Sequence, residues 1–246
     1  MELPLEFKET TSRLLNDEFP SFIKALETTA PTSIRYNDKS DYVPAGSLVP
    51  WCPNAVYLPE RPLFTADPLF HAGAYYVQEA SSMFLREVVT QFFRGAETVL
   101  DLCAAPGGKS TLLAQTLSDN CMLVSNEIIR SRAYVLAENL NKWGRENTLV
   151  TNNDASVFGK LRHFFDAIVV DAPCSGEGMF RKDNAAISEW SPQNVEICAA
   201  RQKDILTDVW DALKPGGILV YSTCTYNEQE NEENIKWAAS NFDAEI

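Results

Sequence analysis

The segment Thr98-Val-Leu-Asp-Leu-Cys-Ala-Ala-Pro-Gly-Gly-Lys-Ser110 decides the expected fold. Its apolar first half predicts a buried strand over 98–103, and its second half is a turn of small residues. The residues after the turn favour a helix over 109–117. A strand, a tight glycine turn and a helix in this order predict one βα unit of a parallel sheet.

The same alternation continues along the chain. The later strands are short, continuous apolar runs, which are typical of strands covered by helices on both faces. The sequence therefore predicts an α/β fold with a doubly wound, mostly parallel, Rossmann-like sheet. The further expected elements are helices over 78–93, 129–142, 193–213 and about 228–239, and strands at 122–125, 148–151, 166–171 and 218–222.

The first third of the chain has a different composition. Nine of the thirteen prolines precede residue 70, and only short elements are expected there. Because such a change in composition marks a domain boundary, we expect a small α+β domain over residues 1–72 and the larger α/β domain over 73–246. The short elements are helices near 4–15 and 18–28 and strands at 33–37 and 56–58.

The overall composition bounds the class of protein. The chain has 246 residues, of which 45% are hydrophobic, enough for a full α/β core. No apolar run approaches the roughly 18 residues that a membrane span needs, and the N-terminus lacks the basic-then-apolar order of a signal peptide. We expect a soluble, cytoplasmic protein.

The charge balance limits binding to nucleic acid. The chain carries 34 acidic and 21 basic residues, a net charge of −13. Since Lys and Arg supply most non-specific affinity for nucleic acid, the whole surface cannot be a nucleic-acid-binding surface, but a local basic groove remains open. Three close pairs could contribute to one, with ordinary solvated surface as the alternative: Arg130 and Arg132, Arg181 and Lys182, and Arg201 and Lys203.

The six cysteines have no metal-binding spacing. They show no Cys-x-x-Cys pair, and only two histidines accompany them, so no metal is expected. In the cytoplasm the thiols stay reduced. Cys52, Cys121 and Cys198 are interpreted as buried small side chains. Cys174 and Cys224 differ, because both follow strand ends in polar, turn-forming surroundings.

The turn after the strand at 98–103 is a candidate ligand-binding turn. Its small side chains let backbone N–H groups approach a ligand at the start of a helix. A Walker A loop would need glycine where Cys103 stands, and the dinucleotide fingerprint Gly-x-Gly-x-x-Gly is absent. A merely structural tight turn is the other alternative. The candidate residues are Cys103, Ala104, Ala105, Pro106, Gly107, Gly108 and Lys109.

Two acids follow the next strands. Glu127 lies twenty residues after Gly107, where an acidic side chain commonly accepts hydrogen bonds from ribose hydroxyls. Asp154 follows the third strand of the sheet and could accept from an adenine amino group. Each acid alone has a second interpretation as a solvated strand-end carboxylate. Together with the glycine turn, they indicate an adenosine-containing ligand, and S-adenosylmethionine fits better than ATP.

Three motifs resemble the signatures of one enzyme family. They are Cys103-Ala-Ala-Pro-Gly-Gly-Lys109, Asp171-Ala-Pro-Cys-Ser-Gly176 and Ser222-Thr-Cys-Thr-Tyr226, and they are similar to the motifs of the RNA cytosine-5 methyltransferases, which include ribosomal RNA small subunit methyltransferases B and F. Gly73–Ser82 and Ser33–Asn37 resemble the segment before the catalytic domain and the N-terminal domain of that family. The resemblance covers most of the chain. It implies a class I methyltransferase fold with an N-terminal domain of an RNA-binding type.

The resemblance also implies roles for individual residues. Cytosine C5 is too weak a nucleophile to take a methyl group directly, so a thiolate first adds at C6. By resemblance Cys224 is that nucleophile and Cys174 assists product release, although spacing alone does not rank them. Asp171 would hydrogen-bond the N3 and amino edge of the base, and Lys109 would contact the methionine carboxylate or the base and favour nearby thiolates. Cofactor binding is assigned to the turn residues and to Glu127, Arg132, Asp154 and Asp171.

The substrate implied by this resemblance is RNA, with small-subunit ribosomal RNA as the first expectation and transfer RNA as the nearest alternative. A non-catalytic RNA-binding or ribosome-assembly factor that retains the fold is the alternative of a different class. A class I sheet normally ends in two further strands, so a chain that stops at Ile246 is expected to be truncated. The acidic run Glu228–Glu233 is interpreted as an ordinary helix start.

Overall fold

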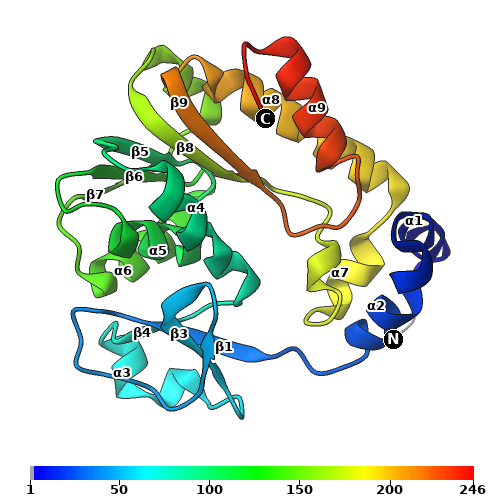
Figure 1. The fold of residues 1–246 in the computed structure, drawn as a ribbon, viewed down its shortest axis with the longest axis horizontal. Coiled ribbons are helices and arrows are strands. Elements are labelled where there is room, and N and C mark those ends of the chain that lie inside the picture. Colours follow the sequence, from blue (N-terminus) through cyan, green and yellow to red (C-terminus); the bar gives the residue numbers. More distant parts are fainter. Residues whose placement is uncertain (1–2) are drawn as a thin grey trace. The chain divides into compact units, whose positions relative to one another are not determined.

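The computed structural model describes residues 3–246, so residues 1 and 2 of the domain expected over 1–72 lie outside the described residues. It divides into two compact units, each assembled from segments distant in sequence (Figure 1). The α/β unit comprises Pro31–Asp171 and Asp211–Val220. The helical unit comprises the described residues up to Ala30, Ala172–Trp210 and Tyr221–Ile246. The boundary expected after residue 72 concerns composition along the chain, not which segments pack together, and stays a prediction.

The larger sheet of the α/β unit has five strands in the order β7-β6-β5-β8-β9. The pairs β5–β6, β6–β7 and β5–β8 are parallel, which confirms the predicted Rossmann-like sheet. β9 continues into the helical unit after Val220. The strands are β5 (Thr98–Asp101), β6 (Met122–Asn126), β7 (Thr148–Thr151), β8 (Phe165–Asp171) and β9 (Leu213–Ser222).

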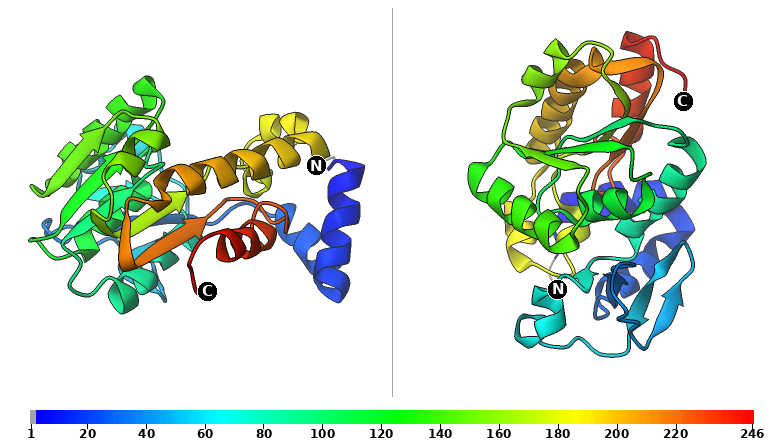
Figure 2. Two further views of the ribbon diagram at one scale, coloured as in Figure 1. Left: turned by 90° about the horizontal axis from the view of Figure 1, so that it is seen from above. Right: turned by 90° about the vertical axis from the view of Figure 1, so that its left-hand side faces the viewer.

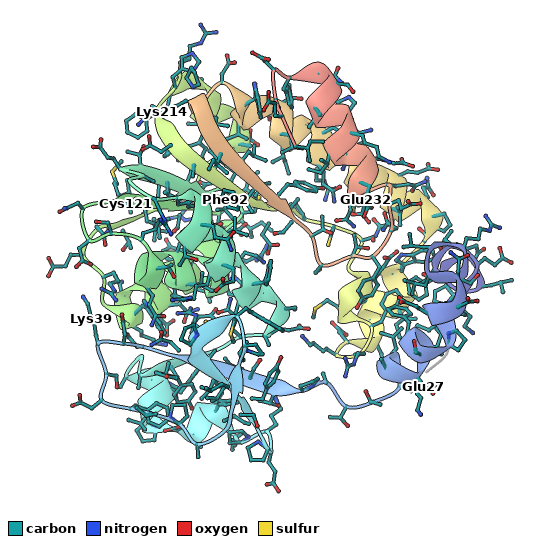
Figure 3. All side chains as sticks on the ribbon, in the orientation of Figure 1. Glu27, Lys39, Phe92, Cys121, Lys214 and Glu232 are labelled. Atoms are coloured by element: carbon teal, nitrogen blue, oxygen red, sulfur yellow. The ribbon has the colours of Figure 1, made fainter. Side chains whose placement is uncertain are left out.

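Three helices lie on one side of this sheet: α4 (Leu85–Phe92), α5 (Gly108–Thr116) and α6 (Arg130–Trp143) (Figure 1). α6 shows why these segments are helical, since it buries Ala133, Leu136, Leu140 and Trp143 at helical spacing. It ends at Gly144, whose φ of +73° favours glycine and whose carbonyl accepts a hydrogen bond from Lys39 Nζ at 2.7 Å. Lys39 is labelled in Figure 3.

The second sheet of the α/β unit is antiparallel, with the order β2-β3-β1-β4. β2 and β4 were not predicted. The α-helix expected from residue 78 begins only at Leu85. The Gln78 N–H still donates to the Ser33 carbonyl of β1 (3.2 Å), and Ser81–Phe84 form a 3-10 helix that leads into α4. The elements are β1 (Thr32–Tyr36), β2 (Ser47–Val49), β3 (Cys52–Leu58), β4 (Tyr75–Val77) and a short helix, α3 (Pro68–His71).

Arg35 on β1 fastens this second sheet to α5. Its guanidinium is buried and donates to Gln115 Oε1 (2.6 Å), Thr111 Oγ1 (2.5 Å) and Gln78 Oε1 (3.0 Å), and it lies 4.4 Å from the Trp143 ring centre. Burial lowers the pKa of Arg35 to about 10, so the side chain is still charged at neutral pH. The charged guanidinium of Arg35 and its hydrogen bonds therefore hold α5, the helix that follows the glycine turn, against the second sheet.

The helical unit has its own apolar core. Phe7 packs edge-on against Phe180 at a ring distance of 5.0 Å, and Leu26, Trp190 and Val195 complete the contact. The N-terminal helices thus pack against the chain that follows Cys174. α8 and α9 lie side by side in the same unit (Figure 2). The helices are α1 (Leu5–Leu15), α2 (Phe19–Leu26), α7 (Asn184–Glu189), α8 (Pro192–Trp210) and α9 (Glu232–Asn241).

Two features are absent from the part of the chain that the structure describes. No helix within 3–246 is long and apolar enough to cross a membrane. No group of three or more His, Cys, Asp or Glu side chains in the same range could hold a metal ion.

Candidate active site

The glycine turn lies between β5 and α5, as the sequence predicts. Gly107 precedes the first residue of α5 with a φ of +113°, a conformation that side chains disfavour. The carbonyls of Ala105 and Pro106 accept hydrogen bonds from Arg132 Nη2 and Asn139 Nδ2 of α6, both at 2.8 Å. The turn is therefore held in shape by side chains of the next helix, as a preformed ligand-binding turn requires.

Asp101, at the end of β5, was not predicted as a site residue. Its Oδ2 accepts a hydrogen bond from Ser110 Oγ at 2.6 Å, whereas its buried Oδ1 has no partner within residues 3–246. Burial, reinforced by the charge of Asp171, raises the pKa of Asp101 to about 7. A buried acceptor without a donor suits a ligand that brings an N–H group. The acidic residue directly before the glycine turn was the signal in the sequence.

Cys103 opens the turn and carries a neutral thiol. Burial raises the pKa of Cys103 to about 12, and the carboxylates of Asp101 and Glu127 act in the same direction. Because the thiolate is the reactive form of cysteine, the raised pKa makes Cys103 a poor nucleophile. Its expected place in the cofactor-binding turn stays a prediction.

Glu127 lies at the end of β6, and its carboxylate is almost fully buried. Oε1 accepts the backbone N–H of Ile129 at 2.9 Å, and Oε2 lies 3.4 Å from Arg132 Nη1. Arg132 thus joins two predicted site elements, the Glu127 carboxylate and the Ala105 carbonyl. The expected contacts of both residues with a cofactor stay predictions.

Asp154 is exposed, unlike Glu127. Its Oδ1 accepts both the backbone N–H (3.0 Å) and the hydroxyl (2.6 Å) of Ser156, and so caps the short 3-10 helix Ala155–Lys160. The hydrogen bonds from Ser156 lower the pKa of Asp154. The structure therefore gives Asp154 a local capping role in addition to the ligand contact that the sequence predicts.

Asn126 connects three strand ends and was missed by the sequence analysis. Its Nδ2 donates to the carbonyls of Leu102 (3.1 Å) and Asn153 (3.0 Å), and its Oδ1 accepts from Thr151 Oγ1 at 2.9 Å. These partners follow or end β5 and β7, while Asn126 itself ends β6. The residue fixes the sheet edge that carries the glycine turn and Glu127.

Lys109 and Asp171 form an ion pair in the same unit. Lys109 Nζ lies 2.7 Å from Asp171 Oδ2, with both side chains partly exposed. The first turn of α5 and the end of β8 are brought together as expected for neighbouring parallel strands. The roles predicted for the two residues toward the base and the methionine carboxylate stay predictions.

The helical unit contains the two cysteines that the sequence singled out. Cys174 Sγ and Cys224 Sγ lie 3.1 Å apart, and Cys224 is the more exposed. The hydrogen bond to Cys224, together with burial, raises the pKa of Cys174. Cys174 therefore holds its proton more tightly than a free thiol does, and the exposed Cys224 is the more accessible of the two sulfur atoms.

The other cysteines behave as predicted. Cys52, Cys121 and Cys198 are buried, and Cys121 is labelled in Figure 3 next to β6. Burial is the main cause that raises the pKa of each. The prediction that these three are small buried side chains is confirmed.

The acidic run before α9 only partly follows its interpretation. Glu232, labelled in Figure 3, and Glu233 lie in the first turn of α9, where carboxylates suit the positive end of the helix. Glu230 precedes the helix and is fully buried, so the helix-start interpretation is wrong for it. Its carboxylate instead accepts hydrogen bonds from Ser175 and Gln202.

The parallel sheet, its glycine turn and the acids at its strand ends define the class I methyltransferase fold. The chain belongs to the family described as 16S rRNA methyltransferase RsmB/F, which matches residues 92–244. The description "N-terminal domain of 16S rRNA methyltransferase RsmF" matches residues 3–80. The family resemblance predicted from the three motifs is confirmed.

Individual members of this family are similar in sequence to the chain. Ribosomal RNA small subunit methyltransferase F of Pectobacterium carotovorum is 40% identical over 98% of this chain and 53% of its own length. The enzyme of the same name from Cronobacter sakazakii is 42% identical over 79% of this chain and 42% of its own length. The chain spans about half the length of the curated relatives it matches.

Solved structures share the fold. A methyltransferase homolog protein from Pyrococcus horikoshii superposes with a TM-score of 0.82 and 30% identity, over 96% of this chain and 78% of that one. NSun6 from Pyrococcus horikoshii, at 20% identity, superposes with a TM-score of 0.81 over 96% of this chain and 87% of that one.

Proposed function

We propose that this chain carries the catalytic part of an S-adenosylmethionine-dependent methyltransferase that acts on C5 of a cytosine in RNA. The observation that supports it most directly is the thiol pair, with the sulfur atoms of Cys174 and Cys224 3.1 Å apart and the pKa of Cys174 raised by that contact and by burial. A methyltransferase that acts on an oxygen or nitrogen atom needs no thiol nucleophile. A carbon acceptor as weak as cytosine C5 does.

The residues of the α/β unit fit S-adenosylmethionine. The unpartnered Asp101 Oδ1 is an acceptor for the ammonium group of the methionine part, and the turn Cys103–Lys109 places small residues at a helix start. The buried Glu127 is a suitable acceptor for ribose hydroxyls. When bound, the cofactor supplies an electrophilic methyl group.

Cys224 performs the first chemical step of the proposed reaction. Its thiolate adds to C6 of cytosine, an S–C6 bond forms, and the electron pair of the C5–C6 double bond moves onto C5. C5 thereby becomes nucleophilic and would take the methyl group of the bound cofactor, whose S–CH3 bond would break and leave its electron pair on the sulfur. Asp171, oriented by Lys109 at 2.7 Å, stabilises the charge that develops along the N3 and amino edge of the base.

Cys174 serves the last step. Its pKa is raised by a hydrogen bond to the Cys224 sulfur and by burial, and the first and larger of these effects ends once that sulfur is bonded to C6. Cys174 can then release its proton to solvent and take the C5 proton of the adduct. The electron pair of the C5–H bond re-forms the C5–C6 double bond, the S–C6 bond breaks, and Cys224 leaves as a thiolate.

Small-subunit ribosomal RNA is the proposed substrate, because the matched relatives bear the name ribosomal RNA small subunit methyltransferase F. This substrate implies a cytoplasmic location and RNA as the partner. Transfer RNA is the second candidate substrate, on the strength of the shared chemistry alone. A target base must leave its stack to react, and splayed bases in RNA loops need the least energy for this.

Methyl transfer to defined RNAs tests the proposal. The purified chain is incubated with small ribosomal subunits, deproteinised ribosomal RNA or transfer RNA, and S-adenosylmethionine carrying a labelled methyl group, followed by bisulfite sequencing. We expect new 5-methylcytosine in the ribosomal RNA. Label in transfer RNA only would change the substrate, and RNA binding without methyl transfer would support the non-catalytic alternative.

A further inference from the structure

Two buried carboxylates join the loops that carry the cysteines. The Cys174 loop (Ala172–Gly178) contains Glu177, and the Cys224 loop (Thr223–Glu230) ends with Glu230. Glu177 is 2% exposed and Glu230 is fully buried. Both loops and both carboxylates belong to the helical unit. None of the chemical steps proposed above uses either acid.

Glu177 reaches from the Cys174 loop to the backbone of the other loop. Its Oε2 accepts the N–H groups of Tyr226 (2.7 Å) and Asn227 (3.1 Å), two and three residues after Cys224. Its Oε1 accepts the indole N–H of Trp190 at 3.0 Å. The carboxylate therefore binds the chain just beyond Cys224 and is itself held by the helical core.

Glu230 makes the reciprocal contact. Its Oε2 accepts the N–H of Ser175, the residue directly after Cys174, at 3.0 Å. The same oxygen accepts from Gln202 Nε2 at 2.8 Å, and Gln202 Nε2 also lies 3.0 Å from the Pro173 carbonyl. Each cysteine loop thus supplies a carboxylate that binds the backbone of the other.

Asn227 and Gly178 complete the connection. Asn227 Nδ2 lies 3.1 Å from Glu177 Oε1 and 2.8 Å from Glu230 Oε1, so one amide contacts both carboxylates. The Gly178 N–H donates to the Cys224 carbonyl at 2.7 Å. A Cβ atom at Gly178 would lie 2.5 Å from that oxygen, so only glycine permits this approach.

Burying two carboxylates is costly unless every oxygen receives donors. Here all the donors are neutral N–H groups, and most of them belong to the two cysteine loops. The hydrogen bonds therefore fix the conformation of those loops. Because the contacts run in both directions, neither loop can move without breaking bonds of the other. We propose that Glu177 and Glu230 are positioning residues that set the distance between the Cys174 and Cys224 thiols and thereby the reactivity of Cys224.

We call the hydrogen bonds of Glu177 and Glu230 between the two cysteine loops the brace. Its importance for catalysis rests on the proposed function, but the brace itself can be tested without RNA. Diamide measures the approach of the two thiols: they give it two electrons and two protons, and an S–S bond forms between Cys174 and Cys224. The rate is followed by mass spectrometry of peptides from the intact chain. The rate of Cys224 alkylation by iodoacetamide against pH gives a second readout, which a merely structural change would not shift.

Three variants weaken the brace and one serves as a control. Glu177→Gln and Glu230→Gln replace an acceptor oxygen with an NH2 group that faces N–H donors, and Gly178→Ala pushes directly on the Cys224 carbonyl. Glu232→Gln makes the same chemical change on an exposed carboxylate of α9. We expect disulfide formation to slow about tenfold or more in the first three, the loss of one bond to a charged group being worth about that factor. We expect Cys224 alkylation in them to require a higher pH, and Glu232→Gln to match the wild type.

Binding of S-adenosylhomocysteine, measured by calorimetry, should stay within about twofold of wild type in all four variants, since its proposed site lies in the other unit. If the two Gln variants do not fold, the thiol rates of Gly178→Ala alone test the brace, because this substitution buries no new polar group. Thiol rates and pH profiles within about twofold of wild type in folded variants would overturn the brace. A wild-type chain that shows the expected thiol chemistry but methylates no RNA would refute the proposed function and leave the brace standing.

Discussion

The two units of the molecule position their chemistry in different ways. In the α/β unit the candidate cofactor residues follow strand ends, and the backbone of the parallel sheet places them. In the helical unit the two thiols lie in loops fifty residues apart, and side chains such as Glu177 and Glu230 place them. A sheet edge is built by many backbone hydrogen bonds, to which side chains such as Asn126 add, whereas the thiol pair depends on a few carboxylates. Single substitutions should therefore have sharper effects in the helical unit.

The largest effects are expected at the thiols themselves. Cys224→Ala should abolish methyl transfer, by about a thousandfold or more, together with any covalent RNA adduct, because the S–C6 bond cannot form. Cys174→Ala should instead trap a protein–RNA species that survives denaturing electrophoresis, since attack still occurs while release stalls.

The opposite pattern, with an adduct in Cys224→Ala and none in Cys174→Ala, would exchange the two roles. No adduct in either variant or in the wild type would count against covalent catalysis. The measurement needs S-adenosylmethionine, RNA and an intact α/β unit, so cofactor binding by each variant is its control.

The contrast between the units also marks how far the sequence could predict the structure. The glycine turn, Glu127 and the parallel strands were predictable because they follow one another locally and strand order places them. Glu230 was misinterpreted because its partners, Ser175 and Gln202, lie far away in the sequence. An acidic run looks the same whether its side chains face water or a buried N–H group.

Several helix and strand boundaries also differ from those that the local sequence pattern predicted. Residues 75–77 form β4 beside β1, the Gln78 N–H also donates to β1, and Ser81–Phe84 form a 3-10 helix, so α4 starts seven residues later than its apolar pattern indicated. β9 was expected from residue 218 but begins at Leu213 and includes the Lys-Pro-Gly-Gly segment, whose turn-forming residues had indicated a loop. Asn126 was missed because an asparagine at a strand end has no distinctive pattern, and its partners follow or end other strands.

In the α/β unit, the buried Asp101 makes the free energy of unfolding depend on pH. The pKa of Asp101 is raised from an ordinary 3.8 to about 7, mainly by burial, so the folded state holds this proton more tightly than the unfolded state does. Its contribution to stability is therefore complete below about pH 3.8 and is lost as the pH rises through about 7. Between pH 5.5 and 8.5 the wild type should lose on the order of 2 kcal/mol that Asp101→Asn keeps.

Urea unfolding, followed by the fluorescence of tryptophans including the buried Trp143, measures this difference at several pH values. Asn can still accept the Ser110 hydroxyl, so the variant should fold. Parallel pH profiles for the two proteins would show that Asp101 is ionised in the fold throughout this range. Saturating S-adenosylhomocysteine should reduce the difference, because an N–H donor at Oδ1 favours the charged carboxylate.

The smallest effects are expected for the two strand-end acids, and they differ from each other for a structural reason. Glu127 is buried, so a ribose hydroxyl that loses its carboxylate partner finds no water in its place, and Glu127→Gln should weaken S-adenosylhomocysteine binding by about tenfold. Asp154 is exposed and its Oδ1 is already engaged by Ser156, so Asp154→Asn should cost about threefold or less. Calorimetry measures both affinities, and diamide oxidation of the thiol pair, which should be unaffected, confirms that the helical unit is intact. Equal affinities for Glu127→Gln and the wild type would remove the ribose assignment and with it the main cofactor role proposed for β6.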